Sequence, residues 1–459
     1  MATATEKPRG AQTHPDVRSY GEVNEDIIQM LDRPGKWWWI LLGMSIAGIG
    51  LLAFSWGNQI INGIGVSGLN TPVGWGAYIT TFVFWVGIAH SGTLISAVLF
   101  LFRARWRQSI YRAAEAMTVF AVMTAGLYPL IHLGRVWHAY WLFPYPNQRL
   151  LWPNFASPLV WDVFAVSTYF TVSSLFFLLG LIPDVAAARD QAKEGTLRHR
   201  LYKTVAFGWR GTDRQWHHFG KAYLYLAALA TPLVLSVHSV VSWDFAMSIV
   251  PGWTTTIFAP YFVAGAIFSG IAMVITILVP IRKIFGLEKY LTTKHFDAMA
   301  KLCLVTGLVV FYAYLTEFFM AWYSGKPSER AVFWNRAFGS YWWATWIMLT
   351  CNGIIPIMLW FKRVRYSIPA LFVITLFINI GMWFERYVII VTSLSHEYIP
   401  FAWNVYRPSL TEMGIVIGTF GWFFFWMLLF IRLLPPVAIA EIKEVLPPPF
   451  RPKKKEVAR

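Results

Sequence analysis

The sequence predicts an all-α integral membrane protein with about ten transmembrane helices. Of its 459 residues, 57% are apolar and only 14% are charged, whereas soluble proteins average about 45–50% apolar and about 25% charged residues. Ten apolar runs reach the length of about 20 residues that is needed to cross the bilayer core. Because a backbone in lipid must satisfy its own hydrogen bonds, each run is expected to be a helix. The composition excludes a soluble enzyme.

The ten predicted spans follow a polar leader, residues 1–36. They cover residues 37–57, 77–102, 113–133, 158–183, 219–242, 253–281, 298–323, 340–361, 366–393 and 409–433. The first run is not a signal peptide, because it is long, follows that leader and opens on Trp37-Trp38-Trp39. A basic, proline-rich tail, residues 434–459, follows the last span, and its Pro447–Pro449 and Lys453–Lys455 predict an extended arm.

The distribution of positive charge predicts how the chain is oriented. Thirty of the 39 lysine and arginine residues lie in the segments on one side of the predicted spans, and six lie on the other side. Since the side richer in Lys and Arg faces the cytoplasm, both termini are predicted to be cytoplasmic. In so apolar a chain, the net charge of +16 indicates topology and contact with anionic lipid rather than nucleic-acid binding.

A short internal repeat predicts two similar units. Gly87–Gly92 (GIAHSG) in the second span resembles Gly265–Gly270 (GAIFSG) in the sixth. The spacing predicts two four-helix bundles, residues 77–242 and 253–393, with the first and last spans flanking them. The small residues of the repeat would let helices approach closely.

Ionisable residues inside a membrane are costly, so they indicate function by default. One group lies near the outer ends of consecutive spans in the first unit: His132, Arg135, His138 and Asp162. A histidine and a carboxyl can each hydrogen-bond a quinol hydroxyl and accept its proton. The nearby aromatic residues could form flat walls for the ring: Trp137, Tyr140, Trp141, Trp152 and Trp161. The alternative is that these residues cap helix ends and form an ordinary interfacial belt.

A second group of polar residues could relay protons. It contains His90 near mid-depth, and His238, Asp244, Glu317, Glu385 and Arg386, which are assigned to the second unit. Chains of acids and histidines of this kind carry protons in pumps. The alternative is a structural role, in which neighbouring charges neutralise one another.

The cysteines and histidines limit which redox groups this chain can hold. Cys303 and Cys351 lie in separate apolar runs, which excludes a disulfide framework and any zinc or iron–sulfur site ligated by this chain alone. A two-haem cytochrome b needs four axial histidines, but only His90, His132 and His238 lie clearly inside spans. One haem between His132 and His238 remains as an alternative.

Four longer motifs resemble the NrfD/polysulfide-reductase family of membrane subunits. They are residues Ser239–Asp244, Gly252–Val263, Thr316–Tyr323 and Asn379–Tyr387. The similarity runs through essentially all ten spans. The ten-span form is most similar to the branch of the family found in alternative complex III, which has two sister subunits of this type, and the motifs do not separate the two.

The resemblance implies a multi-pass, haem-free subunit of the bacterial inner membrane that binds menaquinol as substrate at its periplasmic side. It places the quinol at His138 and Asp162, supported by Arg135 and His132 and contacted by Trp137 and Trp161. Electrons would pass to a periplasmic iron–sulfur subunit, then to c-type haem subunits and a terminal oxidase, with a second NrfD-like subunit and lipid as further partners and no nucleic acid. Proton translocation would use the second polar group: His90, His238, Asp244, Glu317, Glu385 and Arg386.

Two other functional classes fit some of these features. A secondary transporter also has two similar bundles with polar groups at mid-membrane. However, its broken helices should carry glycine or proline at matched depths, and Pro129, Pro232 and Pro356 form no matched pair. A purely structural anchor for a peripheral enzyme would have no need of buried carboxyl groups.

Overall fold

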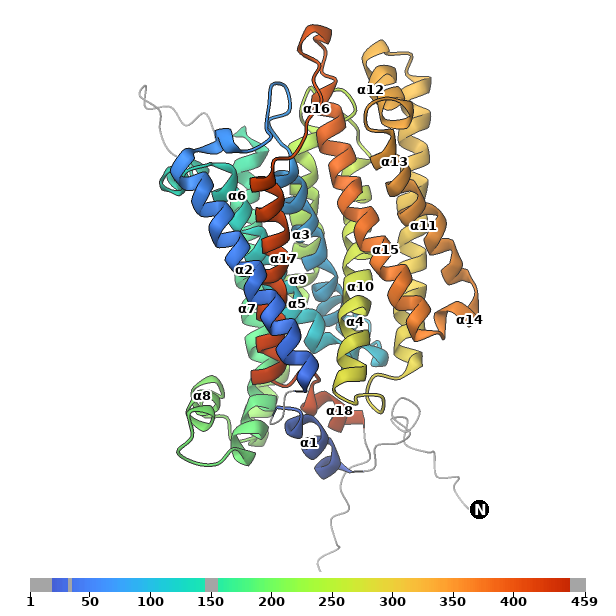
Figure 1. Ribbon diagram of the computed structural model, residues 1–459. Coiled ribbons are helices and arrows are strands. Elements are labelled where there is room, and N and C mark those ends of the chain that lie inside the picture. The colour runs from blue at the N-terminus through green and yellow to red at the C-terminus, as the bar shows by residue number, and fades with distance from the viewer. Residues whose placement is uncertain (1–18, 32–34, 145–155, 446–459) are drawn as a thin grey trace, which may run out of the picture.

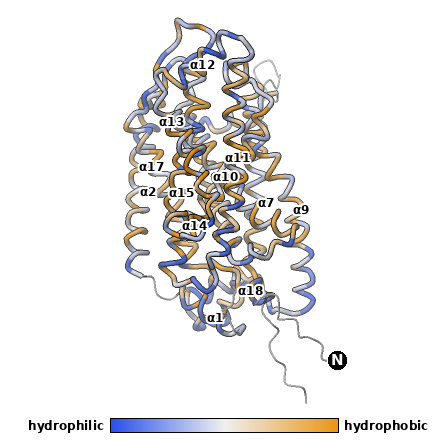
Figure 2. Tube along the Cα trace, turned by 90° about the vertical axis from the view of Figure 1, so that its right-hand side faces the viewer, coloured by the Kyte–Doolittle hydropathy of each residue, from blue (hydrophilic) through white to orange (hydrophobic). Residues whose placement is uncertain are grey.

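The computed structural model describes residues 19–31, 35–144 and 156–445. Within these ranges ten helices are long and apolar enough to cross a membrane, which confirms the predicted all-α membrane protein (Figure 1). Trp152 and the tail segments Pro447–Pro449 and Lys453–Lys455 lie outside the described residues. Figure 2 shows the apolar character along the middle of the bundle and hydrophilic segments at its ends.

The ten spans are built from continuous and interrupted helices. In order they are α2 (Lys36–Asn62), α3 (Ala77–Thr93) with α4 (Leu99–Leu101), α5 (Tyr111–Ala125) with α6 (Leu127–His132), α7 (Pro158–Gln191), α9 (Asp213–Ala246), α10 (Phe258–Ile284), α11 (Thr293–Tyr323), α13 (Trp342–Leu349) with its continuation to Trp360, α15 (Ile368–Tyr387) with α16 (Ser393–Ser395), and α17 (Leu410–Leu433). Five short helices lie outside the spans: α1 (Tyr20–Gln29), α8 (Leu197–Val205), α12 (Pro327–Phe338), α14 (Lys362–Arg365) and α18 (Ile439–Val445).

Several helices begin or end away from the limits of the apolar runs. Helix α9 begins at Asp213, six residues before the predicted span, because Thr212 and Gln215 form a capping box that fixes the start. Helix α10 begins at Phe258 rather than residue 253, since Gly252 has a φ of 80° and turns the chain there. Caps and turns thus set helix ends, whereas hydropathy locates only the part in lipid.

Eight of the described spans fall into two sets of contacting helices. Helices α3, α5, α7 and α9 contact one another, and so do α10, α11, α13 and α15; we call these sets the first and second bundles. The two sets meet where α3 packs against α10 and α15 and where α9 packs against α10. Helices α2 and α17 pair with each other, and α17 also packs against α3 and α5 (Figure 1).

Glycines of the repeat lie where helices touch. A Cβ atom on Gly270 of α10 would lie 2.1 Å from Ser91 Oγ and 2.8 Å from the Ile88 carbonyl oxygen of α3. A Cβ on Gly92 of α3 would lie 2.1 Å from the Ala114 carbonyl oxygen of α5. The missing side chains therefore set the distance between the bundles and between the first two helices of the first bundle.

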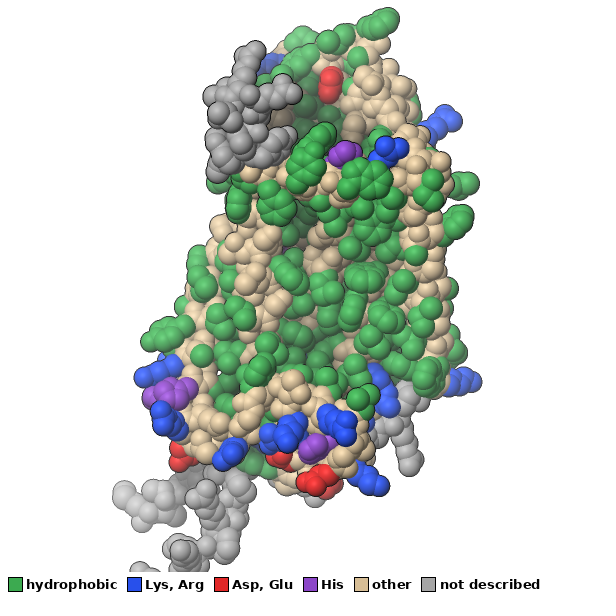
Figure 3. All heavy atoms as spheres, turned by 90° about the vertical axis from the view of Figure 1, so that its left-hand side faces the viewer, with side chains coloured by type: hydrophobic (Ala, Val, Ile, Leu, Met, Phe, Trp, Pro, Cys, Tyr) green, Lys and Arg blue, Asp and Glu red, His purple; other side chains and the backbone are tan. Residues whose placement is uncertain are grey.

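One end of the bundle, which we call the basic end, carries α1, α8 and α18 (Figure 1). Figure 3 shows Lys and Arg side chains gathered there below a band of hydrophobic side chains. Helix α18 is held there by an ion pair of 2.9 Å between Arg107 and Glu441, and Lys443 donates to Asn24 of α1. Burial raises the pKa of the Glu441 carboxyl, and the Arg107 guanidinium opposes that shift. Parts of the predicted leader and tail are therefore folded onto the bundle.

Gly270→Val should destabilise the protein by about 1–3 kcal/mol, because the new side chain would meet both a side chain and backbone of α3. Thermal denaturation of the detergent-solubilised chain measures the effect. Gly43→Val is the matched control, since a Cβ at this helical position meets no atom within 4 Å. An equal loss of stability in both variants would contradict the proposed role of Gly270.

Candidate functional site

Two Trp-Asp dipeptides come together at the end of the bundle opposite α1, which we call the outer end. Asp162 lies near the start of α7, and Asp244 lies in the last turn of α9. Because the two helices are neighbouring and antiparallel, both acids reach the same level. Their carboxyl groups lie close enough to interact with each other. The preceding rings of Trp161 and Trp243 meet edge to face at a centroid distance of 6.2 Å.

The two aspartates have buried carboxyl oxygen atoms that are available to bind a ligand or accept a proton. Asp162 is only 6% exposed, and the Oδ1 atoms of Asp162 and Asp244 are buried without a hydrogen-bond partner among the described residues. Two carboxyl groups that interact in a buried site cannot both be charged without a large cost, so a proton shared between them is favoured. A buried acceptor without a partner calls for a ligand or an ordered water.

Two cavities adjoin the outer end of the bundle. The first, of about 370 Å³, is lined by Trp243, Ala246 and Met247 of α9 and by Thr254–Thr256. The second, of about 580 Å³, shares Thr254–Thr256 and extends to Glu317 of α11 and to α12. Both fall in the size range of small-molecule sites, about 300–1,000 Å³. The threonine segment therefore separates a cavity that reaches Trp243, the residue before Asp244, from a cavity that reaches Glu317.

The other members of the predicted outer group lie on the segment that follows α6. His132 ends α6, and His138 stacks on Trp141 with ring centroids 5.1 Å apart. Arg135 is exposed and lies over the ring of Trp137 at 5.6 Å. The Nδ1 atoms of His132 and His138 lack hydrogen-bond partners among the described residues. The direct partner of Asp162 is Asp244, rather than any of these three.

Two histidines from different helices meet at the centre of the protein. His90 of α3 and His238 of α9 are fully buried, and their ring centroids lie 4.6 Å apart. Tyr169 of α7 stacks on the other side of His90 at 5.0 Å. His90 donates from Nδ1 to the Val86 carbonyl at 2.5 Å, which leaves its Nε2 as an acceptor. That atom and both ring nitrogens of His238 lack partners among the described residues.

The second bundle contributes a buried ion pair close to these histidines. Arg386 Nη1 lies 3.0 Å from Glu385 Oε1, and the guanidinium lies 4.4 Å over the ring of Phe262, which also contacts His238. Glu385 accepts a hydrogen bond from Tyr314, whose hydroxyl accepts one from Asn352 at 2.9 Å. A line of polar groups therefore crosses the interface between the two bundles.

Helical irregularities cluster around this line of polar groups. Three segments are π-helical: Leu94–Val98, Thr350–Ile354 and Val388–Thr392. The first begins four residues after His90, the second contains Asn352, and the third begins two residues after Arg386. A π-helical turn opens the regular hydrogen-bond ladder and is found disproportionately at functional sites. The irregular backbone lies inside the protein here, where exposed carbonyls can be satisfied.

Glu317 lies between this centre and the outer end. It lines the second cavity, and its Oε1 is buried without a partner among the described residues. Arg336 of α12 donates to Thr392 at 2.8 Å and Ser393 at 2.7 Å. Burial lowers the pKa of the Arg336 guanidinium, and the negative charge of Glu317 opposes that shift. Glu317 is thus placed between a cavity and the buried polar groups of the second bundle.

A second buried charge cluster was not predicted from the sequence. Arg112 of α5 donates to Asp184 of α7 at 2.9 Å and to Glu115 at 3.1 Å, and all three side chains are buried. Tyr223 of α9 adds a hydrogen bond to Glu115. Arg112 and Asp184 lie just outside the apolar runs, where hydropathy marks them as loop residues. The sequence did carry one signal of this ion pair: Arg112 and Asp184, of opposite charge, lie at the same end of two neighbouring spans.

The site residues do not gather around a metal. Within the described ranges, no three His, Cys, Asp or Glu side chains are arranged to hold a metal ion. Cys303 and Cys351 are buried and separate. The ring of His238 packs against His90 and Phe262, which disfavours the alternative of a haem between His132 and His238.

The fold and the site define a class: a multi-pass helical membrane protein with an acid pair at one end and a buried polar line between two bundles. Residues 65–396, which make up most of the chain, match the family described as "Polysulphide reductase, NrfD". The chain belongs to this family, as its motifs predict.

Two curated relatives are similar to this chain. One, from Halobacterium salinarum, is described as a membrane subunit of dimethyl sulfoxide reductase and is 27% identical over 242 residues, which cover 52% of this chain and 50% of the relative. The other, from Mesobacillus selenatarsenatis, is described as a subunit of selenate reductase and is 22% identical over 392 residues, which cover 79% and 86%. The chain spans about half the length of the first relative and most of the second.

Arg112→Met should destabilise the protein by about 3–5 kcal/mol, because it leaves Asp184 and Glu115 buried without their cation. Thermal denaturation in mild detergent measures the loss. Lys289→Met is the control, since Lys289 pairs with Glu22 at the surface and is 46% exposed. Its effect should be much smaller, because exposed ion pairs contribute little to stability, and similar losses in both variants would contradict the burial argument.

Proposed function

We propose that this protein is the quinol-oxidising membrane subunit of a respiratory oxidoreductase in the bacterial inner membrane. The acid pair of Asp162 and Asp244 carries the proposal, because its buried Oδ1 atoms lack partners among the described residues and the neighbouring Trp243 lines a cavity. The substrate is menaquinol, bound at the outer end, and the charge distribution of the sequence favours the periplasm for that end.

The chemistry of quinol oxidation fits this pair. A quinol gives up two protons as its two electrons leave, and a carboxyl within hydrogen-bond reach of a ring hydroxyl can accept one. Asp162 and Asp244 offer two buried oxygens without partners among the described residues. We assign His138, Arg135 and His132 as supporting polar groups and Trp137 and Trp161 as contacts of the ring.

The electrons must pass to another polypeptide in this proposal. The acceptor is an iron–sulfur subunit docked at the outer end, followed by c-type haem subunits, a second NrfD-like subunit and a terminal oxidase. Membership of the NrfD family supports a subunit of a larger complex, and both relatives are described as subunits of reductases. The ten-span form favours alternative complex III, in the position of its ActC subunit, with the sister subunit ActF as the alternative.

We further propose that the buried polar line moves protons. Its members are His90, His238, Arg386, Glu385 and Glu317, and they join the centre of the protein to the second cavity. Their nitrogen and oxygen atoms that lack partners among the described residues call for ordered water, which would complete a relay. Asp244 belongs to the quinol site in this scheme, since its partner is Asp162.

Asp162→Asn should lower quinol-driven reduction of the partner's acceptor by about 100-fold, because an amide cannot accept the proton. Turnover is measured on the purified assembly with a soluble menaquinol analogue. Asp190→Asn, on the same helix but exposed at the basic end, is the control and should keep full activity. Normal turnover of the Asp162→Asn variant, in an intact assembly, would remove Asp162 from the proposed site.

Glu317→Gln should leave quinol oxidation largely intact, while proton release beyond the two protons of each quinol falls to near background. Proton release is followed with a pH dye in proteoliposomes that hold the assembly. Glu317→Asp keeps a carboxyl in the second cavity and should restore part of the signal. If the native assembly releases no protons beyond those of quinol oxidation, the relay is wrong and these acids are structural.

The composition of the purified assembly separates this proposal from a secondary transporter. Co-isolation with haem and iron–sulfur proteins supports the oxidoreductase, whereas solute uptake by the chain alone supports the transporter. Transporter sites use broken helices at mid-membrane. Helix α9 continues unbroken through Pro232, whereas π-helical turns interrupt the spans that contain α3, α13 and α15, so the composition of the assembly decides between the two classes.

A further inference from the structure

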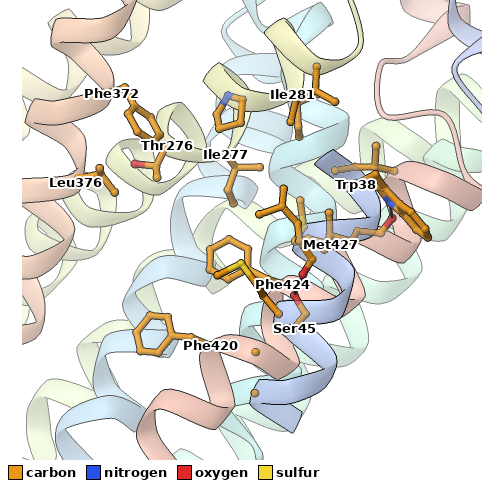
Figure 4. A pocket seen from close by; sticks show the side chains of 18 of the residues that line it. Trp38, Ser45, Thr276, Ile277, Ile281, Phe372, Leu376, Phe420, Phe424 and Met427 are labelled. Carbon is orange, nitrogen blue, oxygen red and sulfur yellow. Dashed lines mark hydrogen bonds between the residues drawn. The ribbon is translucent and has the colours of Figure 1, made fainter. Parts of the chain in front are cut away.

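An apolar groove lies between the flanking helix pair and the second bundle, far from the acid pair. It has a volume of about 450 Å³ and is lined by α2, α10, α15 and α17 (Figure 4). Its walls include Trp38, Ile281, Leu376, Phe424 and Met427. All of these residues lie in the halves of their helices nearest the basic end.

The groove owes its shape to the seam between α2 and α17. A Cβ atom on Gly421 would lie 2.7 Å from the Cα of Gly48, so the two helices touch backbone to backbone at this level. Both glycines line the groove, and neither has a side chain to fill it. The groove opens outward on the flank of the spans, where the lining residues Met44 and Ile417 are 66% and 53% exposed.

The polar atoms of the walls are already satisfied. Trp38 Nε1 donates to the Leu428 carbonyl at 3.0 Å, Ser45 Oγ donates to the Leu41 carbonyl at 2.9 Å, and Thr276 Oγ1 donates to the Ala272 carbonyl at 2.8 Å. The walls thus offer hydrocarbon contact without a free hydrogen-bonding group. An acyl chain fits this chemistry, whereas a quinol ring or a peptide end would bury polar atoms without partners.

Positive charge lies at the basic ends of two helices that line the groove. Lys36 begins α2, two residues before Trp38, and Lys283 lies in α10 between the lining residues Ile281 and Ile284. Both lysines are exposed, and neither has a carboxylate partner within the described part of the chain. At the ends of membrane helices, exposed lysines reach the headgroup layer.

We propose that this groove is a binding site for one anionic phospholipid of the cytoplasmic leaflet. One acyl chain occupies the space between α2, α10, α15 and α17, and the phosphate lies against Lys36 and Lys283. The site is independent of the proposed quinol chemistry, because it lies at the opposite end of the spans and shares no residue with the acid pair. The lipid would fill the space left by the glycine seam and tie the flanking helices to the second bundle.

Native mass spectrometry of the full chain in mild detergent tests the proposal, with phosphatidylglycerol and phosphatidylcholine of identical acyl chains as probes. Each lysine near a headgroup contributes about 1 kcal/mol, or roughly fivefold in affinity. Phosphatidylglycerol should therefore be retained in preference to phosphatidylcholine, and Lys36→Gln with Lys283→Gln should reduce that preference roughly 25-fold. Lys203→Gln with Lys221→Gln, the same charge change at the basic end of the first bundle, should leave it unchanged.

The position of the lipid is tested by photo-cross-linking the full chain with phosphatidylglycerol that carries a diazirine in its acyl chain. Cross-links should map to Leu41, Ile281 and Leu376, and Leu376→Trp, which fills the groove, should abolish them. Equal retention of the two lipids, cross-links elsewhere only, or a transmembrane segment of another protein seated in the groove would each overturn the proposal.

Discussion

The close contact between α3 and α10 is the constraint on which the rest of the structure depends. At Gly270 no side chain separates the helices, so the two bundles meet within van der Waals distance. Because α9 packs against α10 as well, this contact brings His238, His90 and the Arg386 ion pair to the same interface. A wider spacing would leave each of these groups alone in an apolar interior, where an unpaired charge costs several kcal/mol.

The buried ionisable residues fall into two kinds, according to how many of their polar atoms have a hydrogen-bond partner. Arg112, Asp184 and Glu115 pair at the basic end of the first bundle, as a structural cluster does, and of their described side-chain atoms only Arg112 Nε lacks a partner. Both ring nitrogens of His238 and the Oδ1 atom of Asp162 lack partners within the described residues. Buried polar atoms of this kind call for a ligand or an ordered water. The proposed quinol site and proton relay therefore use these residues, whereas the paired Arg112 cluster serves stability.

The two bundles share a plan but carry different chemistry at their outer ends. The first has the acid pair of Asp162 and Asp244, and Trp243 lines the smaller cavity there. The second has Glu317 on the larger cavity, with Arg336 near it. Among the described residues, only the threonine segment Thr254–Thr256 lines both cavities. This arrangement suits a division in which the outer end of the first bundle takes hydrogen from the substrate, while His90 and His238 join the second bundle in moving protons.

The sequence by itself determined the number of spans, their approximate limits and the family, because these depend on local hydropathy and on contiguous motifs. It also singled out Asp162, Asp244, His90 and His238, since ionisable residues stand out in apolar runs. Only the tertiary structure decided the partners: it paired Asp162 with Asp244, where the sequence grouped Asp162 with His138, and it placed His238 beside His90. Partners across a bundle depend on helix rotation and spacing, which small residues such as Gly270 set, and a single sequence does not encode these distances locally.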